Sequence, residues 1–324
     1  MRQKHLSFSH SFIPFNSFIL ILILFFCSCG NTGNQAIKQS ESDTVTDDYG
    51  RTVAVPTHPQ RVVSLSPAVT EIMFALGAQE ILVGRTDFCT YPPEAEAIPS
   101  IGGISNLNIE SILALNPDLV ISGSMVGKKV TDQMDAMGVP MVCVIEKPKF
   151  EALYDNIATI GELVGKERKA NKLIENLKIE INLLKHFDSV KSQDPHSTIP
   201  TCYYVVGFGA GGNFTAGGNT FINDIIRMAG GRNIAEGIEG WSYSLEALMK
   251  EDPDFIIVRR EDSAAFCDMK PYNRLSAVKN GHVIGIVSGT LDLQVPRNID
   301  AVIYLRSRFG KTTIPPPPLQ GSEE

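Results

Sequence analysis

Two glutamates stand at the same place in a phrase that occurs twice in the chain. Aligned without a gap, residues 108–121 read NIESILALNPDLVI and residues 244–257 read SLEALMKEDPDFII, so Glu110 matches Glu246. Each phrase opens with a helix-capping side chain, asparagine in the first copy and serine in the second. A carboxylate two residues later faces the positive end of the helix macrodipole, which stabilises it by about 0.3–1 kcal/mol. From these residues alone, a structural role and a functional role of the two glutamates are equally open.

A glycine-rich stretch raises the question of an enzyme. GFGAGG, residues 207–212, follows a strand-like run and matches the G-x-G-x-x-G pattern of dinucleotide-binding sites. In those sites the third glycine belongs to an opening helix, whereas here NFTAGGNT follows and no apolar helical face begins before Phe221. The chain has no phosphate-binding P-loop, no G-x-S-x-G and no H-E-x-x-H. An oxidoreductase is therefore a remote alternative, and we expect no enzyme activity, no catalytic residue and no cofactor.

The elements that would position these motifs alternate along the chain. From residue 61 onward, short β-branched runs alternate with helical ones, which predicts a mostly parallel sheet covered on both faces. The alternation stops at a long helix, about residues 166–188, with one apolar stripe of helical spacing, and then starts again. The sequence thus predicts an α/β fold in which two similar lobes with mostly parallel sheets are joined by a long backbone helix.

The N-terminus resembles a bacterial lipoprotein leader. Basic residues precede FILILILFF, an apolar run too short to cross a bilayer but suited to a secretory signal. The small Ser28 before Cys29 makes Cys29 the expected lipidated residue of the mature protein. The predicted organisation is a leader (1–28), a flexible tether (29–48), an N-terminal lobe (49–165), the backbone helix (166–188), a C-terminal lobe (189–310) and a disordered tail (311–324).

Charge and cysteines narrow the class of partner. The 324 residues carry a net charge of −7, which disfavours nucleic acid, because phosphate binding needs a basic surface. No cysteine or histidine cluster has zinc spacing, so no metal site is expected. Cys89 and Cys267 lie in predicted loops and would pair in an oxidising compartment only if the fold brings them together, which the sequence leaves open.

Several motifs in a fixed order resemble one family over about residues 50–310: RVVSLSPAVTEIMFALG, YPPEA, IPSIGG, NIESILALNPDLVISG, FTAGGNTFINDIIRMAGGRNIA, SLEALMKEDPDFIIV, AVKNGHV and PRNIDA. They are similar to the substrate-binding proteins of ABC importers for cobalamin, haem and ferric siderophores. The resemblance implies two lobes on a rigid helix, a ligand in the cleft between them, and docking onto a permease with its ATPase. In that family one glutamate on each lobe meets arginines of the permease, which assigns docking to Glu110 and Glu246.

The resemblance also implies a cleft lining. Phe88, Tyr91, Phe214 and Trp241 match aromatic positions that pack on the macrocycle in cobalamin binders, and Tyr243 and Arg297 are further candidates. Stacked aromatic rings suit a flat, partly apolar chelate. PSIGGISN and ISGSMVG lack a tryptophan that cobalamin binders can have, so cobalamin is favoured rather than fixed.

The other ligands of the family remain alternatives. Haem would take Tyr91 or Tyr243 as axial ligand, because His58 and His282 lie in turns. An anionic siderophore would need cleft arginines. The expected protein is a monomer, anchored by lipid on the periplasmic side of a bacterial membrane, that captures a metal chelate.

Overall fold

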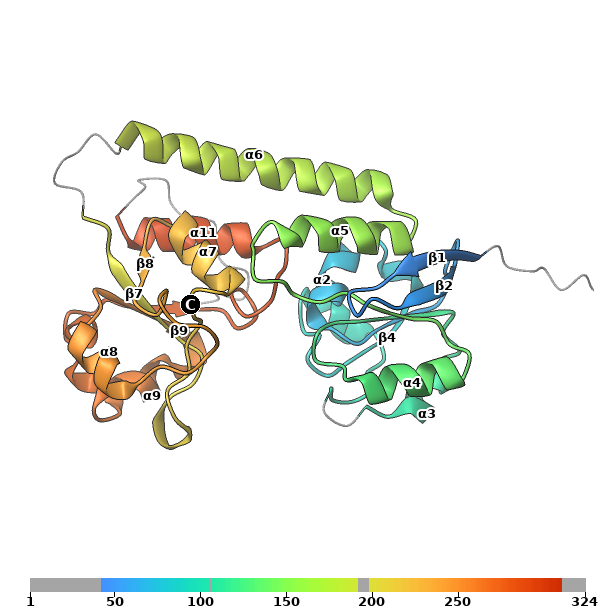
Figure 1. Ribbon diagram of the computed structural model, residues 1–324, viewed down its shortest axis with the longest axis horizontal. Helices are drawn as coiled ribbons and strands as arrows, with labels where there is room; N and C mark the ends of the chain where they lie inside the picture. The colour runs from blue at the N-terminus through green and yellow to red at the C-terminus, as the bar shows by residue number, and fades with distance from the viewer. Residues whose placement is uncertain (1–41, 105–106, 192–197, 311–324) are drawn as a thin grey trace, which may run out of the picture. The chain divides into compact units, whose positions relative to one another are not determined.

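The computed structural model of the protein describes residues 42–104, 107–191 and 198–310, with the side chains of residues 42 and 185–191 excepted. The predicted leader 1–28, the lipidation site Cys29 and the tail 311–324 lie outside these residues. The described residues form two lobes, both lying below one long helix (Figure 1). Among them, no helix combines the length and the apolar character needed to cross a bilayer.

The N-terminal lobe is built on a four-stranded parallel sheet. Its strand order is β4-β3-β5-β6, and an antiparallel hairpin of β1 and β2 lies in a separate two-stranded sheet. The elements of this lobe are β1 (Ser42–Thr46), β2 (Thr52–Pro56), β3 (Val62–Ser64), α2 (Pro67–Ala75), β4 (Leu82–Arg85), α3 (Ile109–Ala114), β5 (Leu119–Ser122), α4 (Lys128–Ala136), β6 (Met141–Cys143) and α5 (Ala152–Leu163), with short 3-10 turns at Gln79–Ile81 and Pro93–Ala97.

Strand β1 falls inside the segment for which the sequence predicts a flexible tether to residue 48. The run SDTVT is polar overall, yet it ends in three β-branched residues, and it pairs with β2 in a register that sets Val45 opposite Val53. Val53 and Val55 are buried in the lobe, so the hairpin has an apolar face to cover. Local β-branching outweighs the polar composition here.

The C-terminal lobe repeats the same sheet. Its strand order is β10-β9-β7-β8, also parallel, so each lobe places its second, first, third and fourth strands side by side in that order. The elements are β7 (Thr201–Val205), α7 (Phe221–Met228), β8 (Arg232–Asn233), α8 (Leu245–Glu251), β9 (Phe255–Arg259), α9 (Ser263–Asp268), α10 (Ser276–Lys279), β10 (Val283–Ile286) and α11 (Asn298–Arg308), with 3-10 turns at Gly209–Gly211, Arg260–Asp262 and Tyr272–Arg274. The two similar α/β lobes predicted from the sequence are confirmed.

Alternation along the strands gives each sheet two buried faces. In β7, Tyr204 enters one apolar cluster, while Tyr203 and Val205 enter another on the opposite face. In β3, Val62 and Val63 divide in the same way between two clusters. This is the period of two expected of a strand whose sheet is covered on both sides. Each lobe therefore has a core face of its own and a face that belongs to a shared cluster.

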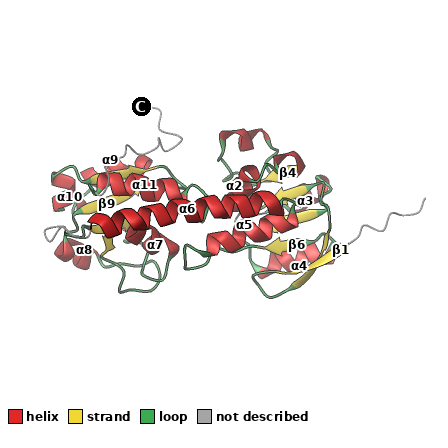
Figure 2. Ribbon diagram, turned by 90° about the horizontal axis from the view of Figure 1, so that it is seen from above, coloured by secondary structure: helices red, strands yellow, loops and turns green. Residues whose placement is uncertain are grey.

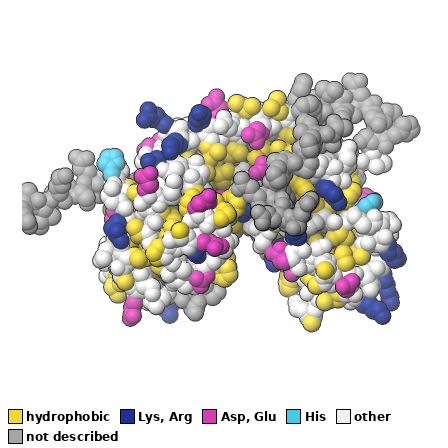
Figure 3. Space-filling view, turned by 180° about the vertical axis from the view of Figure 1, so that it is seen from behind, with side chains coloured by type: hydrophobic (Ala, Val, Ile, Leu, Met, Phe, Trp, Pro, Cys, Tyr) yellow, Lys and Arg dark blue, Asp and Glu magenta, His cyan; other side chains and the backbone are white. Residues whose placement is uncertain are grey.

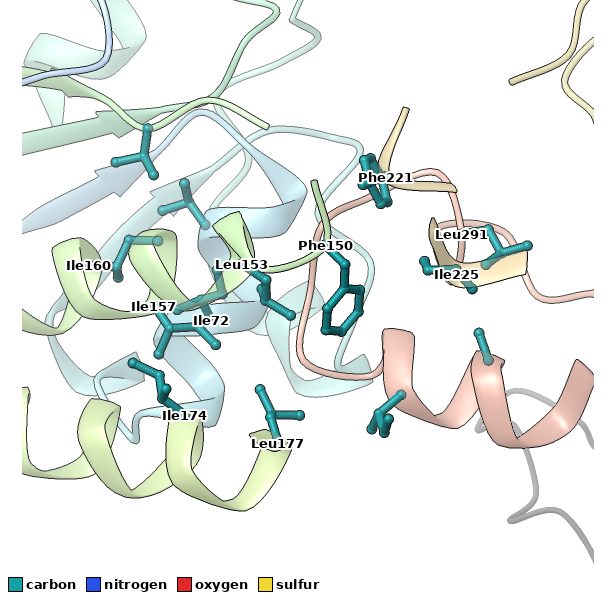
Figure 4. Close-up of a cluster of buried hydrophobic side chains, with 14 of the residues drawn as sticks. Ile72, Phe150, Leu153, Ile157, Ile160, Ile174, Leu177, Phe221, Ile225 and Leu291 are labelled. Carbon is teal, nitrogen blue, oxygen red and sulfur yellow. The ribbon is translucent and has the colours of Figure 1, made fainter. Parts of the chain in front are cut away.

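The shared cluster lies beneath helix α6 (Glu167–Lys191). The stripe predicted from the sequence points into it, with Ala170, Ile174, Leu177 and Ile181 all buried. Seen from above, α6 runs over α5 in one lobe and toward α7 and α11 in the other (Figure 2). The close-up shows that this cluster continues from one lobe to the other (Figure 4). Ile72, Phe150 and Leu177 lie at one end of the cluster and face Phe221, Ile225 and Leu291 at its other end, in the C-terminal lobe.

Polar contacts join the lobes beside this apolar layer. Gln294, fully buried in the C-terminal lobe, donates from Nε2 to the carbonyls of Lys147 (3.3 Å) and Lys149 (2.8 Å). Its Oε1 accepts from Asn156 Nδ2 at 3.2 Å and from the Lys147 N–H at 3.3 Å. Asp224 accepts from the Phe150 N–H at 3.2 Å. A buried amide with four partners holds the lobes at a defined spacing.

The repeated phrase has the same local structure in both lobes. Helix α3 is capped by Asn108, which accepts from the Ser111 N–H, and α8 by Ser244, which accepts from the Ala247 N–H. Both helices end in a residue of left-handed conformation, Asn116 (φ 45°) and Asp252 (φ 40°), just before the proline. Asparagine and aspartate tolerate this region better than other side chains with a β-carbon.

The aspartate that follows each proline ties the phrase to the first strand of its lobe. Asp118 accepts from the N–H groups of Gln60 (2.7 Å) and Arg61 (3.0 Å), just before β3. Asp254 accepts from the N–H and the hydroxyl of Thr201, both at 2.8 Å, at the start of β7. The phrase thus recurs because each lobe uses it to fix a helix end against its central strands.

We predict that Asp118→Ala and Asp254→Ala each lower the free energy of unfolding by about 1–2 kcal/mol, since each removes two hydrogen bonds to a carboxylate. The measurement is urea unfolding followed by circular dichroism. Asp132→Ala is the matched control, because its pairing with Lys128 is an exposed i,i+4 contact worth about 0.5 kcal/mol or less. Losses no larger than that of the control would contradict the assigned role.

Candidate ligand-binding site

A cleft of about 970 Å³ lies between the lobes at the carboxyl ends of both sheets. Several lining residues come directly after the last residue of a strand: Leu65 after β3, Gly123 after β5, Val206 after β7 and Val287 after β10. Ligands of open α/β sheets bind at this edge, because the loops there converge and the strands end. In the space-filling view the surface is hollowed between the lobes, and hydrophobic side chains gather along the hollow (Figure 3).

The aromatic wall of the N-terminal lobe is a loop held by a buried arginine. Arg85, at the end of β4, donates to the carbonyls of Ala95 (2.9 Å), Thr86 (3.0 Å) and Glu96 (3.2 Å). These contacts close the loop that carries Phe88 and Tyr91 into the cleft. Phe88 leaves 59% of its surface exposed there. Arg85 is thereby committed to the loop and does not line the cleft.

Across the cleft, Trp241 is fixed through its backbone. Its carbonyl accepts from the Thr215 N–H at 2.7 Å, and the next residue, Ser242, bridges to Phe214. The indole lines the cleft and is 48% exposed. Two aromatic rings from different lobes thus stand half-uncovered on the walls of one cavity.

An ion pair between the lobes lies in the same lining. Arg297, at the start of α11, donates from Nε to both carboxylate oxygens of Glu71 in α2, at 2.9 and 3.0 Å. The guanidinium also lies 4.1 Å from the centre of the Tyr91 ring, a cation–π contact. Burial raises the pKa of Glu71 to about 7, and the charge of Arg297 opposes that rise. Burial followed by the charge of Glu71 raises the pKa of Tyr91, so its phenol stays protonated.

A second arginine of the lining is also paired. Arg259, at the end of β9, lies 3.4 Å from Asp292 Oδ2 through Nε and 3.6 Å from Asp262 through Nη1. Asp292 accepts a hydrogen bond from the buried hydroxyl of Tyr204 as well. Burial and then the charge of Asp292 raise the pKa of Tyr204 well above its usual value, so the phenol remains the donor.

The six residues that the resemblance assigned to the cleft divide into two groups. Phe88, Tyr91, Trp241 and Arg297 line it together. The Phe214 ring instead packs against the glycine loop, where a β-carbon on Gly207 would lie 3.1 Å from it. Neither Phe214 nor Tyr243 is among the described residues that line the cleft.

Tyr243 is half-buried and packs against the core of the C-terminal lobe. Its ring lies 5.6 Å from that of Tyr203, and its hydroxyl donates to the Ile234 carbonyl at 3.4 Å. It packs against the cluster that contains Leu248 and Ile256. Trp241, two residues earlier, lines the cleft instead.

Sequence reasoning missed several lining residues. Glu71, Met125, Glu146 and Asp292 all face the cleft, and Met125 is 72% exposed. The signal that would have found Met125 is its place in LVISGSM, three residues after the end of β5 in a parallel sheet. Glu71 gave no such signal, because it lies inside a helix otherwise buried in the core.

The two repeated glutamates lie away from the cleft. Glu110 in α3 and Glu246 in α8 are exposed, each in the first turn of its helix. Neither is among the residues with an ion pair in the described part of the chain. Each lobe thus presents one such carboxylate at the equivalent place.

The glycine loop is closed on itself. Phe214 and Gly207 exchange backbone hydrogen bonds at 2.9 and 3.2 Å, and the Gly209 N–H donates to the Tyr272 hydroxyl at 3.0 Å. The next α-helix begins only at Phe221. The N–H groups of all three glycines of the pattern, Gly207, Gly209 and Gly212, are therefore engaged within the protein, and the loop lacks the opening helix that binds a dinucleotide phosphate. In the described residues no group of three or more metal-ligating side chains occurs, and Cys89 and Cys267 are free thiols.

Fold and cleft together define a class, the two-lobed binding proteins that hold a solute between their lobes. A family model described as periplasmic binding protein matches residues 62–288. The chain belongs to that family, which is a class of solute-binding proteins and not of enzymes.

Individual relatives of the chain are also solute-binding proteins. The chain is 26% identical over 295 residues to the uncharacterized ABC transporter substrate-binding lipoprotein YvrC of Bacillus subtilis, covering 88% of this chain and 92% of that one. It is 28% identical to a cobalamin-binding protein of Halobacterium salinarum, covering 84% of this chain and 75% of that one. The structure of a periplasmic heme-binding protein from Pseudomonas aeruginosa superposes with a TM-score of 0.72 at 27% identity, covering 81% and 96%.

The ion pair between the lobes predicts a pH dependence of stability. The pKa of Glu71 is raised by folding, so its contribution to stability is fully present below about 4.5 and is lost as the pH rises through about 7. We expect the unfolding free energy of the protein, relative to that of Glu71→Gln, to fall by about 2–3 kcal/mol between pH 5 and pH 8. Urea unfolding of both proteins at the two pH values measures it. A difference that grows with pH would mean that the ionised pair is the more stable form.

Proposed function

We propose that this protein, a solute-binding protein of an ABC importer, captures a metal chelate in the cleft between its lobes, with cobalamin the favoured ligand. It delivers the loaded chelate to a permease, whose ATPase drives release, and it catalyses no reaction itself. The ligand is cargo, so no cofactor is required. The family and the relatives support the transport class, and the choice of ligand rests on the cleft.

The observation that carries the proposal is the pair of uncovered aromatic rings. Phe88 and Trp241 come from different lobes and remain 59% and 48% exposed in a cavity of about 970 Å³. That volume is at the upper end of small-molecule sites, which are about 300–1,000 Å³. A large ligand with apolar faces would cover both rings at once and gain free energy from both walls.

Haem is the first alternative, since a haem-binding structure is among the relatives. Its axial ligand here would be Tyr91, because Tyr243, His58 and His282 are not among the described residues of the lining. Burial and then the charge of Glu71 raise the pKa of Tyr91 and so oppose a phenolate bound to iron, and the nearby guanidinium of Arg297 only partly offsets this rise. Cobalamin needs no such ligand from the protein, which favours it.

A ferric siderophore is the second alternative. An anionic chelate would need free cationic groups in the cleft, yet Arg259 and Arg297 are each paired with a carboxylate. The remote alternative, a dinucleotide-binding oxidoreductase, depends on the glycine loop, where the N–H groups of the three pattern glycines already have partners within the protein.

Ligand binding is testable with the single tryptophan of the chain. We predict that cyanocobalamin quenches the fluorescence of Trp241 with a dissociation constant in the micromolar range or below, about −8 kcal/mol. Trp241→Ala should weaken binding by about 1–3 kcal/mol, measured by calorimetry, whereas Tyr49→Ala, a half-exposed aromatic outside the cleft, should not. Saturable binding of haem or a ferric siderophore with none of cobalamin would refute the ligand.

We infer that Glu110 and Glu246 are the docking groups. Each is exposed at the start of a helix in the equivalent place of its lobe, so the two present a symmetric pair to a permease with two halves. In the resembling family, glutamates at these positions meet arginines of the permease. Stabilisation of each carboxylate by its own helix is compatible with that role.

We predict that Glu110→Arg combined with Glu246→Arg abolishes uptake and leaves ligand affinity unchanged, because like charges at the docking surface cost several kcal/mol. The assay is transport of radiolabelled cobalamin by cells or vesicles carrying the cognate permease. Glu162→Arg with Glu236→Arg, two exposed carboxylates on the same two lobes, adds the same charge and should transport normally. Uptake that persists in the first variant would leave only the helix-stabilising role.

The anchor is proposed at Cys29, which lies outside the described residues, and it would hold the protein on the periplasmic side of the membrane. A relative named as a lipoprotein supports this. We expect Cys29→Ser to lose labelling by a clickable fatty acid and to release soluble protein. The control Cys27→Ser should still be labelled and should stay attached to the membrane. Labelling retained in Cys29→Ser would refute the site.

A further inference from the structure

The charges that line the cleft are not all balanced. Of the described residues in the lining, the cationic ones are Arg259 and Arg297, and the carboxylates are Glu71, Glu146 and Asp292. Arg297 is held by Glu71 at 2.9 Å, and Arg259 by Asp292 at 3.4 Å. Both arginines therefore already have a carboxylate of this chain as partner, and a ligand would have to compete for them.

Glu146 stands apart from these pairs. It follows β6 on the N-terminal wall, is partly exposed, and accepts a hydrogen bond from the Ser124 hydroxyl. The lysine next to it, Lys147, turns away and pairs with Asp48 at 2.8 Å. The carboxylate of Glu146 is thus offered to the cavity with a neutral hydroxyl as its described partner.

The surroundings of Glu146 leave room for a ligand group. Gly123 lies beside it, and a β-carbon there would lie 2.8 Å from the Ser66 hydroxyl and 3.9 Å from Glu146 Oε1. Ser66, Gly123 and Ser124 are all part of the same lining. This corner of the cleft therefore combines one carboxylate with two hydroxyls beside a glycine whose lack of a side chain keeps it open.

We propose that Glu146 is a specificity-determining residue that selects a chelate whose edge carries amide N–H groups or positive charge, and rejects one whose edge carries carboxylates. A carboxylate accepts hydrogen bonds and cannot donate one, so an amide edge satisfies it. A carboxylate edge at the same corner places two like charges together in a partly desolvated site. This inference rests on the proposed function, because it concerns the same cleft and the same class of ligand.

The test uses ligand pairs that differ only at the edge. Cyanocobalamin is compared with each of its monocarboxylic acids, in which one side-chain amide is hydrolysed, and haem is compared with its diamide. Affinities are measured by calorimetry at one pH, pH 8, above the pKa of about 7 of Glu71, so that the ionised form of its carboxylate predominates in every titration. The proteins are the unchanged chain, Glu146→Gln, and the control Glu162→Gln, which makes the same change at an exposed site on α5.

For the unchanged chain and for Glu162→Gln, we expect the amide form of a bound pair to bind at least tenfold more tightly than an acid form. In Glu146→Gln this ratio should fall below threefold, chiefly because the acid binds better. Circular dichroism melting confirms that each variant is folded. An equal ratio in all three proteins would overturn the role of Glu146.

The outcomes separate this inference from the proposed ligand. If cobalamin does not bind but the haem pair shows the preference and Glu146→Gln removes it, the choice of cobalamin fails and the role of Glu146 stands. If cobalamin binds and its acids bind equally well, the role of Glu146 fails and the proposed ligand stands. If neither pair binds, both are overturned.

Discussion

The two lobes share a single apolar layer, and the binding cleft depends on it. The stripe of α6 from Ala170 to Ile181 is buried in one cluster with residues of both sheets, so the lobes cannot separate without exposing it. Interiors of this kind are close-packed and resist deformation. The buried amide of Gln294 adds four hydrogen bonds across the same junction. The width of the cleft is therefore set by the fold before any ligand arrives.

This constraint explains why the functional groups lie where they do. Both sheets direct the carboxyl ends of their parallel strands at one space, the cleft between the lobes. Loops after those strands are free to vary, which is where the aromatic rings and the charged groups of the lining are found. The outer helices α3 and α8 face solvent instead, and each displays one glutamate. The proposed capture and docking would thus use different surfaces of the same molecule.

Much of the fold was predictable because its signals are local. The stripe of α6, the alternation of strands with helices and the caps of α3 and α8 are each written within a few residues. It was harder to predict which aromatic residues line the cleft. Phe214 and Tyr243, which do not, sit in loops whose closure decides which way a ring points. The pair of Glu71 and Arg297 joins residues 226 positions apart and has no local signature. Such contacts arise only when two lobes have already been placed.

The central claim is that the cleft between the lobes is the site where a cobalt chelate is held. The most direct measurement is a crystal structure of the protein grown with cyanocobalamin, with diffraction recorded at the cobalt absorption edge. The account predicts one strong anomalous peak between Phe88 and Trp241, which line opposite walls of the cleft. A peak on an outer face, or none in crystals soaked at saturating cobalamin, would contradict it.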